Sequence, residues 1–242
     1  MPLDFTTLFP VRKPIIGMIH LAGSGHADRV KRALDEMALY QEEGIDGAII
    51  EDYHGNATDV YETVKQSNGR GLSLVRGVNL LSDPYLAFNY AGAFGARFVQ
   101  FDSIETEHLN FELYQRCRQW HPKIQVLGGV RFKCQPESRK SLEQDLKDAR
   151  SLCEAVVTTG PGTGVETPLS KLQEFRHYLD KFPLITGAGV TRDNVEAQLE
   201  YADAAIVGSY FKPAQQTMAP VERSRVRDLM DVVRLVRQFR GR

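Results

Sequence analysis

Carboxylates and cationic side chains recur where short apolar runs of this sequence end, and these are the groups that acid/base catalysis uses. Asp102 ends the run RFVQFD, and Lys133 ends the run IQVLGGVRFK. A buried carboxylate near a lysine can hold either charge state or shuttle a proton. Asp102 and Lys133 are therefore the leading candidate acid/base pair. Lys133 has two other candidate roles, anchoring an anionic substrate and forming a Schiff base with a carbonyl. An ion pair with a purely structural role is the alternative.

Other polar residues stand at comparable positions and extend this candidate site. They are the acid/base candidates Glu51 and Asp52, the substrate-orienting Asn79, the charge-neutralising Arg131, and His20. His20 ends the run MIH, where it could relay a proton or cap a loop. The acids and histidines, with His54, could also ligate a divalent ion. No HxH or HExxH spacing favours a metal, and no cofactor is evident.

Glycines mark two junctions between an apolar run and the segment after it, in PLITGAGVTRDN and in VGSYFK, with Lys212 nearby. Backbone N–H groups without bulky side chains can approach an anion closely, above all where a helix begins. The candidate phosphate-binding residues are Gly187, Ala188, Gly189, Gly208 and Ser209. A third glycine-rich segment, TTGPGTG, contains Thr158 and Gly160 and is a candidate substrate cover.

Eight apolar runs, which alternate with helix-like segments, must position these residues. The runs cover 14–20, 47–52, 73–79, 97–102, 124–133, 154–160, 183–189 and 203–209. Apolar strands that alternate with helices indicate a parallel sheet covered by helices. Eight such units predict one (β/α)₈ barrel of eight parallel strands over residues 1–242, with a short lead at 1–13. A doubly wound open sheet is the alternative. The active sites of such barrels lie at the C-terminal strand ends, where the candidate residues cluster.

Strand side chains alternate between two faces, so the register predicts which residues point into the barrel. Four glycines share one register on the odd-numbered strands: Gly17, Gly77, Gly129 and Gly187. If they point inward, so do Asn79, Arg131, Lys133 and Gly189. The inward set predicted on the even-numbered strands is Asp52, Gln100, Asp102, Thr158, Gly160 and Ser209, and the outward set is Ile49, Val99, Phe101, Val157 and Ile206. Glu51 falls on the outward side but remains a candidate, because strand ends often twist.

Composition argues against several classes of function. The net charge is −1 and the pI is about 6.6, so nothing indicates a nucleic-acid or membrane surface. No apolar stretch reaches the length of a membrane span. The 3 cysteines are far apart and odd in number, which argues against a disulfide framework. No signal-peptide pattern opens the chain. These features predict a cytoplasmic protein without nucleic-acid binding or membrane insertion, and a homo-oligomer stays open.

Several segments, in this order, resemble the BtpA/SgcQ family, which belongs with the ribulose-phosphate-binding barrels. The matching segments are IIGMIHLAG, GIDGAIIEDY, RGVNLLSDPYLAFNYAGAFGARFVQ, EAVVTTGPGTG, PLITGAGVTRDNVEAQLEYADAAIVGSYFK and PVERSRV. The resemblance covers nearly the whole chain and implies a TIM barrel.

Two segments depart from the pattern of that family. Members usually carry an ADVxVKHA-like segment at strand five, where this chain reads LGGVRFKCQ. Lys133 matches the family lysine, but Gly129 replaces the acidic residue and Cys134 replaces the histidine. Strand two reads IED where members read close to VEN, which keeps Glu51 and puts Asp52 in place of asparagine. These changes argue against an activity that needs the missing acid and histidine.

The leading hypothesis is an enzyme that binds a small phosphorylated metabolite, such as a sugar phosphate. It would transfer a proton beside a carbonyl, in isomerisation, epimerisation or aldol cleavage. One alternative is a non-catalytic assembly factor, since one family name refers to photosystem I biogenesis. The other is a lyase or nucleosidase-like activity on a ribosyl compound, which would use the same phosphate site.

Overall fold

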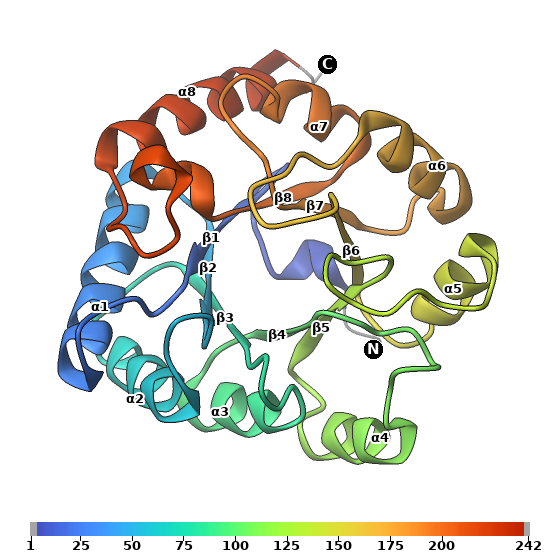
Figure 1. The fold of residues 1–242 in the computed structure, drawn as a ribbon, viewed down its shortest axis with the longest axis horizontal. Coiled ribbons are helices and arrows are strands. Elements are labelled where there is room, and N and C mark those ends of the chain that lie inside the picture. Colours follow the sequence, from blue (N-terminus) through green and yellow to red (C-terminus); the bar gives the residue numbers. More distant parts are fainter. Residues whose placement is uncertain (1–3, 240–242) are drawn as a thin grey trace.

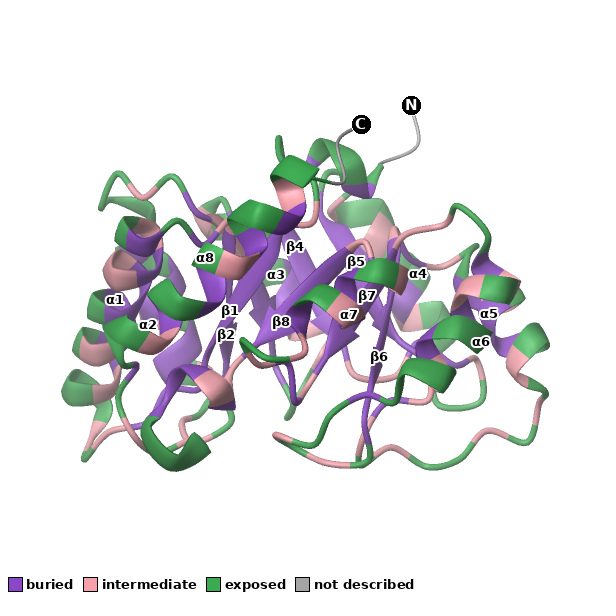
Figure 2. Ribbon diagram, turned by 90° about the horizontal axis from the view of Figure 1, so that it is seen from above, coloured by how far each residue is buried: buried purple, intermediate pink, exposed green. Residues whose placement is uncertain are grey.

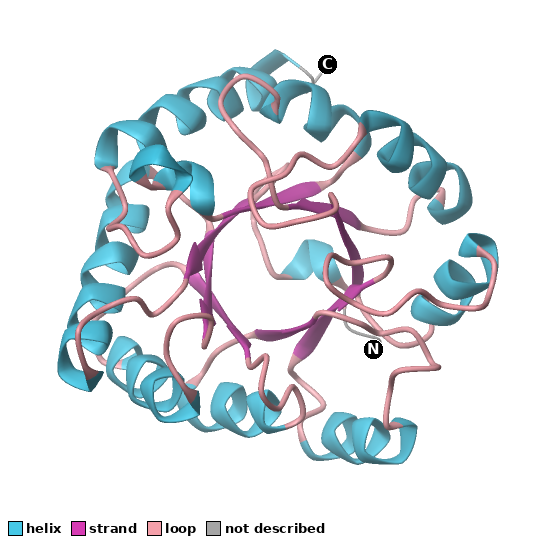
Figure 3. Ribbon diagram, viewed as in Figure 1, coloured by secondary structure: helices cyan, strands magenta, loops and turns pink. Residues whose placement is uncertain are grey.

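Eight parallel strands close into a barrel, and eight helices surround it in a ring (Figures 1 and 3). The strands are β1 (Ile15–Ile19), β2 (Gly47–Glu51), β3 (Val75–Asn79), β4 (Phe98–Phe101), β5 (Gln125–Gly129), β6 (Ala155–Thr159), β7 (Leu184–Gly187) and β8 (Ala204–Val207). Each strand pairs in parallel with the next in sequence, and β1 pairs with β8. The predicted (β/α)₈ barrel is confirmed, and the open-sheet alternative is wrong. This computed structural model describes residues 4–239, so residues 1–3 of the predicted lead lie outside the described part.

The helices follow the strands in strict alternation. They are α1 (His26–Glu43), α2 (Ala57–Asn68), α3 (Leu86–Phe94), α4 (Phe111–Trp120), α5 (Leu142–Ala149), α6 (Leu169–Leu179), α7 (Val195–Tyr201) and α8 (Arg223–Phe239). In the described part of the chain, three 3₁₀ turns add to them: η1 (Phe5–Thr7), η2 (Ser209–Phe211) and η3 (Pro213–Gln215). Among the described residues, no helix is both long and apolar enough to cross a membrane.

Helix α1 shows how the outer ring forms. Its buried residues Val30, Leu34, Met37 and Tyr40 recur at helical spacing, so they lie on one face and pack against the barrel. Gly44 ends the helix with a left-handed φ of 86°, and its N–H bonds back to the last turn. Figure 2 shows the result, with buried strands at the centre and helices exposed on their outer faces.

The N-terminal lead closes the amino end of the barrel. Phe5, Leu8 and Phe9 are buried in the cluster that fills the barrel interior. The ring of Phe9 lies 6.4 Å from the ring of Phe98 on β4. The side-chain amide of Gln125 on β5 donates to the carbonyl of Asp4 at 2.9 Å. The lead is therefore part of the barrel core at this end.

The predicted inward register is correct for three of the four odd-strand glycines. A Cβ on Gly77 would lie 2.1 Å from the ring of Phe98, which fills the barrel interior at that level. Gly129 and Gly187 stand two residues after Leu127 and Ile185, which belong to the interior cluster, so they face the same way. Gly77 makes room for Phe98 inside the barrel, whereas Gly129 makes room for the backbone of Asp102, whose carbonyl oxygen would lie 2.1 Å from a Cβ there.

Gly17 faces the other way, and its predicted inward orientation is wrong. A Cβ there would lie 2.4 Å from the ring of Tyr40, which packs between α1 and the barrel. Its neighbours Ile16 and Met18 belong to the interior cluster instead. Gly17 therefore gives space to a helix residue.

On the even-numbered strands the predicted facing is correct for β4 and wrong for β2, β6 and β8. In β4, Val99 and Phe101 pack outward against the helices. In the other three strands the residues predicted to face outward lie inside the barrel: Ile49, Val157 and Ile206. Glu51 consequently faces inward, whereas Asp52 and Thr158 fall on the opposite face. Both faces of these strands are buried and apolar, so polarity does not reveal which face is which.

Candidate active site

Three neighbouring strands bring two carboxylates to one amide. Glu51 ends β2, Asn79 ends β3 in direct register with it, and Asp102 follows β4. The Asn79 amide nitrogen Nδ2 donates to Glu51 Oε1 at 2.9 Å and to Asp102 Oδ1 at 3.0 Å. Gln100 Nε2 also donates to Asp102 Oδ1, at 3.0 Å. Two acidic groups thus share one donor at the carboxyl end of the barrel.

The two carboxylates do not have the same environment. Glu51 is buried, and burial together with the nearby charge of Asp102 raises its pKa to about 8, although Lys133 opposes this shift. Asp102 is only half-buried. Glu51 therefore carries a proton at neutral pH and can donate it, which is the property of a general acid.

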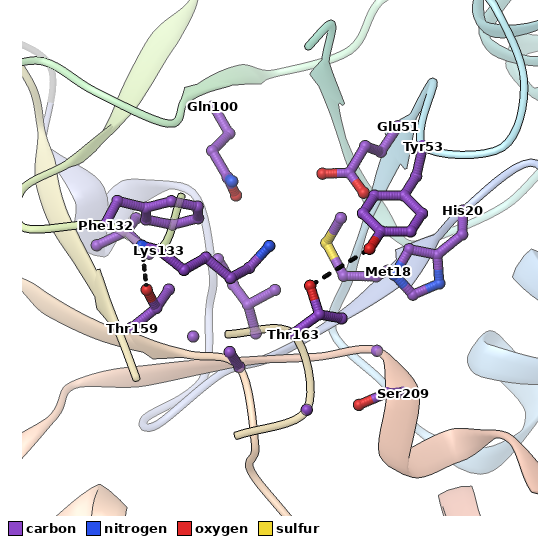
Figure 4. Close-up of a pocket in the computed structure, with 16 residues that line it drawn as sticks. Met18, His20, Glu51, Tyr53, Gln100, Phe132, Lys133, Thr159, Thr163 and Ser209 are labelled. Carbon is purple, nitrogen blue, oxygen red and sulfur yellow. Dashed lines mark hydrogen bonds between the residues drawn. The ribbon is translucent and has the colours of Figure 1, made fainter. Parts of the chain in front are cut away.

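Lys133 supplies the positive charge of this site. Its backbone N–H donates to Thr159 Oγ1 at 2.7 Å, which fixes the loop after β5 against the end of β6. Its side chain reaches over the Phe132 ring, with Nζ 5.4 Å from the ring centroid, and points into the cavity (Figure 4). Within residues 4–239, the Lys133 ammonium makes no ion pair. It is free to meet a ligand, and no Asp102–Lys133 ion pair forms.

A cavity with about 490 Å³ of empty space, its open mouth included, joins this chemistry to the glycine loops. Its polar lining includes His20, Glu51, Gln100, Lys133, Thr159 and Thr163, and its lining from β7 and β8 is Gly187, Ala188, Ile206, Gly208 and Ser209. The glutamate and lysine therefore share one space with four of the five candidate phosphate residues. Asp102 and Asn79 line an adjoining cavity, which Glu51 and Lys133 also border.

The turn after β8 borders this cavity through Gly208 and Ser209. In η2, Phe211 N–H donates to Gly208 O at 3.1 Å and Lys212 N–H donates to Ser209 O at 3.0 Å. These bonds leave the amides of Ser209 and Tyr210 without a partner inside the turn, as at any helix start. Such amides can bind an anion that enters the cavity.

Gly189 does not line the cavity, so it does not have the phosphate-binding position that the sequence predicts. A Cβ there would lie 2.2 Å from the backbone nitrogen of Glu166, so the glycine lets the loop after β6 pack directly on it. Its φ is 63°, in the left-handed region that suits glycine. Asn194 Nδ2 also donates to its carbonyl at 2.9 Å. Gly189 makes space for protein backbone.

His20 lies deep in the same cavity in neutral form. Burial, followed by the charge of Lys212, lowers its pKa well below 6.5. Its Nδ1 is buried without a hydrogen-bond partner, and its ring lies 5.3 Å from that of Tyr53. Lys212 itself is fully buried, with Nζ donating to Thr217 O at 2.8 Å, and burial lowers its pKa to about 8. The proton-relay role of His20 stays a prediction.

Arg131 does not reach the cavity. Its guanidinium forms an ion pair with Asp145 at 2.7 Å and donates hydrogen bonds to the carbonyls of Ser138 and Lys140, so it holds the loop between β5 and α5. The residue lies beyond the end of β5 with a φ of 48°, where strand alternation no longer applies. The predicted inward position of Arg131 is wrong for this reason.

Asp52 likewise serves a loop. Its carboxylate accepts the N–H of Leu81 at 2.7 Å and the hydroxyl of Ser82 at 2.7 Å. These bonds fix the segment between β3 and α3. Of the two neighbouring acids Glu51 and Asp52, only Glu51 lines the cavity.

Thr158 and Gly160 also point away from the cavity. Thr158 is fully buried on the helix side of β6, and its hydroxyl has no hydrogen-bond partner in the structure. A Cβ on Gly160 would lie 2.4 Å from the carbonyl oxygen of Glu166, so this glycine closes the loop on itself. The predicted inward facing of both residues is wrong, but their loop does reach the mouth through Thr163.

Tyr53 and Thr163 are site residues that the sequence did not single out. They come from the loops after β2 and β6, and their hydroxyl oxygens lie 3.4 Å apart across the mouth (Figure 4). Their positions depend on how two distant loops meet, so strand periodicity gives no signal for them. Within the described range 4–239, no three His, Cys, Asp or Glu side chains are grouped to hold a metal ion.

The fold and this site define a (β/α)₈ barrel with an acid/base cluster at its carboxyl end. The sequence model of the BtpA family matches residues 11–235, and the chain belongs to this family. It is 28% identical over 255 residues to an uncharacterized protein of Pyrococcus horikoshii, covering 93% of this chain and 98% of that protein. An uncharacterized protein of Pyrococcus abyssi is also 28% identical, with coverage of 93% and 97%.

Solved structures that resemble this chain share its fold at low identity. A structure described as native KDPGal has a TM-score of 0.67 at 14% identity, covering 93% of this chain and 97% of that one. Phosphoribosyl anthranilate isomerase from Thermus thermophilus has a TM-score of 0.64 at 14% identity, covering 93% and 100%. An isomerase of that kind in complex with reduced 1-(o-carboxyphenylamino)-1-deoxyribulose 5-phosphate has a TM-score of 0.62 at 14% identity, covering 92% and 98%.

Proposed function

We propose that this protein is an enzyme that acts on a small phosphorylated, sugar-like metabolite by acid/base catalysis at the carboxyl end of the barrel. The observation that carries the proposal is the Asn79 amide, which joins Glu51 and Asp102 beside the free ammonium of Lys133. Pairs of acids whose environments separate their pKa values are typical of proton-transfer sites.

Each group has a role in proton transfer beside a carbonyl. Lys133 stabilises negative charge that develops on the carbonyl oxygen, because its ammonium has no competing carboxylate contact. Asp102 removes the proton, and Glu51, protonated at neutral pH, returns one. Asn79 holds both carboxyl groups in place. The outcome is an isomerisation or epimerisation, or a lyase reaction if a carbon–carbon bond breaks at the same stage.

The phosphate would lie at the turn after β8. Gly208 and Ser209 line the cavity at the start of a 3₁₀ turn. The missing side chain of Gly208 makes room for the His20 ring, because a Cβ there would lie 2.8 Å from it. The neighbouring fold that holds a deoxyribulose 5-phosphate ligand supports a phosphorylated substrate in a barrel of this shape. A phosphorylated metabolite also suits the cytoplasmic location expected from the sequence.

Hydrogen exchange tests the proposal directly. The protein is incubated in D₂O with a panel of aldose and ketose phosphates, and deuterium uptake beside the carbonyl is followed by mass spectrometry. We expect uptake with at least one member, and loss of it in Glu51→Gln, Asp102→Asn and Lys133→Met. Matched variants of exposed residues, Glu174→Gln, Asp228→Asn and Lys123→Met, should retain the wild-type rate.

Two results would count against the enzyme. One is the absence of both exchange and thermal stabilisation with every sugar phosphate and with free phosphate at millimolar concentration. The other is a normal phenotype of a deletion strain that carries Asp102→Asn or Lys133→Ala in place of the wild type. Either result favours the non-catalytic assembly factor, whose function would lie on an outer surface.

A further inference from the structure

The mouth of the barrel contains two compartments that meet at Lys133. The first, at β7 and β8, has about 490 Å³ of empty space with its open mouth included, and the second, toward β3 and β4, has about 1000 Å³ counted in the same way. Glu51, Tyr53, Lys133 and Thr163 line both. The contact between the Tyr53 and Thr163 hydroxyls, at 3.4 Å, forms part of the boundary (Figure 4). The groups proposed for catalysis therefore lie where the two spaces join.

The walls of the two compartments differ in chemistry. The first is lined by Gly187, Ala188, Gly208 and Ser209, the residues to which the proposed function assigns the phosphate, and by the Lys133 ammonium. The second has an apolar outer wall formed by Leu81, Pro84, Tyr85 and Leu109. Leu81 is 44% exposed where it borders this compartment. An unsubstituted sugar phosphate bound in the first compartment would leave this wall uncovered.

Tyr85 is held rigidly in that wall. Its hydroxyl accepts the N–H of Asn110 at 2.7 Å, and its ring packs at 77° against Phe101 with centroids 5.5 Å apart. A fixed aromatic side chain beside leucines is a surface on which a flat ring can pack at small entropic cost.

The floor of the second compartment offers a hydrogen-bond acceptor. Asp102 Oδ1 already receives the amides of Asn79 and Gln100. Among the described residues, no group donates to the other oxygen, Oδ2. A ligand that covers this carboxylate must supply a donor there, because burying an unsatisfied carboxylate oxygen is costly. An amino or ring N–H group meets this requirement.

We propose that the substrate has two parts, a phosphorylated sugar in the first compartment and a planar nitrogen-containing ring in the second. The ring packs on Leu81 and Tyr85 and donates an N–H to Asp102. The bond between the two parts then lies at the boundary, beside Glu51 and Lys133. This inference rests on the proposed function, since it names the substrate class of the same site.

Calorimetry with matched ligands tests the two-part substrate. The probes are ribose 5-phosphate, the common ribonucleoside 5′-monophosphates, and the corresponding nucleosides without phosphate. At least one monophosphate should bind ten-fold or more tightly than both ribose 5-phosphate and its own nucleoside. Ribose 5-phosphate reports the first compartment alone, and the nucleoside reports the second alone.

A surface variant assigns the extra affinity to the second compartment. Leu81→Ala should weaken the preferred monophosphate about three- to ten-fold and leave ribose 5-phosphate unchanged. Leu235→Ala, which removes a leucine 52% exposed on α8, is the matched control and should change neither. Circular dichroism of both variants shows that the fold is intact.

The inference fails if ribose 5-phosphate binds as tightly as every monophosphate, if no probe binds, or if Leu81→Ala weakens all probes equally. These failures differ from failure of the proposed function. Deuterium exchange with a simple sugar phosphate, without tighter binding of any monophosphate, would support the proposed enzyme and contradict the ring-binding role of the second compartment. Absence of deuterium exchange together with tight monophosphate binding would contradict the proposed catalysis but support the two-part binding site.

Discussion

The two ends of this barrel use buried space in opposite ways. At the amino end, Phe5, Leu8 and Phe9 meet Phe98 in an apolar cluster. At the carboxyl end, buried Glu51 has a pKa raised to about 8, and His20 is held neutral. Burial of apolar rings stabilises a fold, whereas burial of ionisable groups costs stability and is typical of functional sites. The comparison indicates that stability and chemistry are separated along the barrel axis.

The largest effect that would test this separation is expected from Glu51→Gln. Loss of the proton donor should lower turnover of the substrate by about 10²- to 10⁴-fold, which is the usual contribution of general acid/base catalysis. Activity of the wild type should fall as the pH rises above about 8, where Glu51 loses its proton. Steady-state kinetics over pH 5–10 would check both, and a wild-type rate that does not fall at high pH contradicts the assignment.

Glu51→Gln also tests whether burial of this acid lowers the stability of the fold. The raised pKa means that folded Glu51 binds a proton that the unfolded chain releases between about pH 4.5 and 8. Stability of the wild type should therefore decrease as the pH rises through this window. Glu51→Gln removes that slope, so urea unfolding should show a variant more stable than the wild type at pH 9.

Phe98→Ala is the corresponding change at the amino end. Phe98 is fully buried beneath Gly77 and faces Phe9, so its loss leaves a cavity that the lead cannot fill. We expect a loss of about 3–5 kcal/mol in the free energy of unfolding. Chemical denaturation measures it. Turnover at a temperature where the variant stays folded should remain near the wild-type value, and a large loss of turnover there would contradict the separation.

Arg131→Met tests a residue near the carboxyl end that the structure assigns to a loop. It removes the ion pair with Asp145 and two bonds to carbonyl oxygens, and leaves a carboxylate without its partner. Stability should fall by about 1.5–3 kcal/mol. The KM for substrate should change less than two-fold, whereas a large rise in KM would return Arg131 to the binding site.

The smallest effect is expected from Tyr53→Phe. This change removes the hydroxyl contact with Thr163, which joins two partly exposed loops at 3.4 Å. The unfolding free energy should change by less than about 1 kcal/mol. Substrate association should become faster if the loops open more often, which stopped-flow binding can measure. Thr163→Val should have the same effect, and a double variant should add nothing further.

The sequence predicts the barrel well because alternation of strands and helices extends over the whole chain. It predicts facing well only where the two faces of a strand differ. On β4, polar Gln100 and Asp102 alternate with Val99 and Phe101, and the prediction is correct. On β2, β6 and β8 both faces are apolar, so the register cannot be read from polarity. The predicted outward facing of Glu51 is wrong for this reason.

Residues beyond the strand ends escape prediction for another reason. Arg131 and Ala188 have φ values of 48° and 64°, so the chain turns sharply and the two-residue alternation stops. Asp52 binds the backbone of a loop that begins 29 residues later in sequence. Lys133 lines the cavity as predicted, but the cause is a loop that bends back toward β6 and not the alternation of strand side chains. Such contacts depend on tertiary structure.

The aromatic lead has a consequence for the order of events during folding. Phe9 packs against Phe98 and Gln125 bonds to Asp4, so the lead completes these contacts only when about half of the 242 residues are available. Strand β1 likewise waits for β8 to close the ring. The lead and the β1–β8 pairing therefore depend on contacts between residues distant in sequence, and such contacts slow folding. A chaperone that binds the apolar residues Phe5, Leu8 and Phe9 during synthesis is expected to raise the yield of native protein.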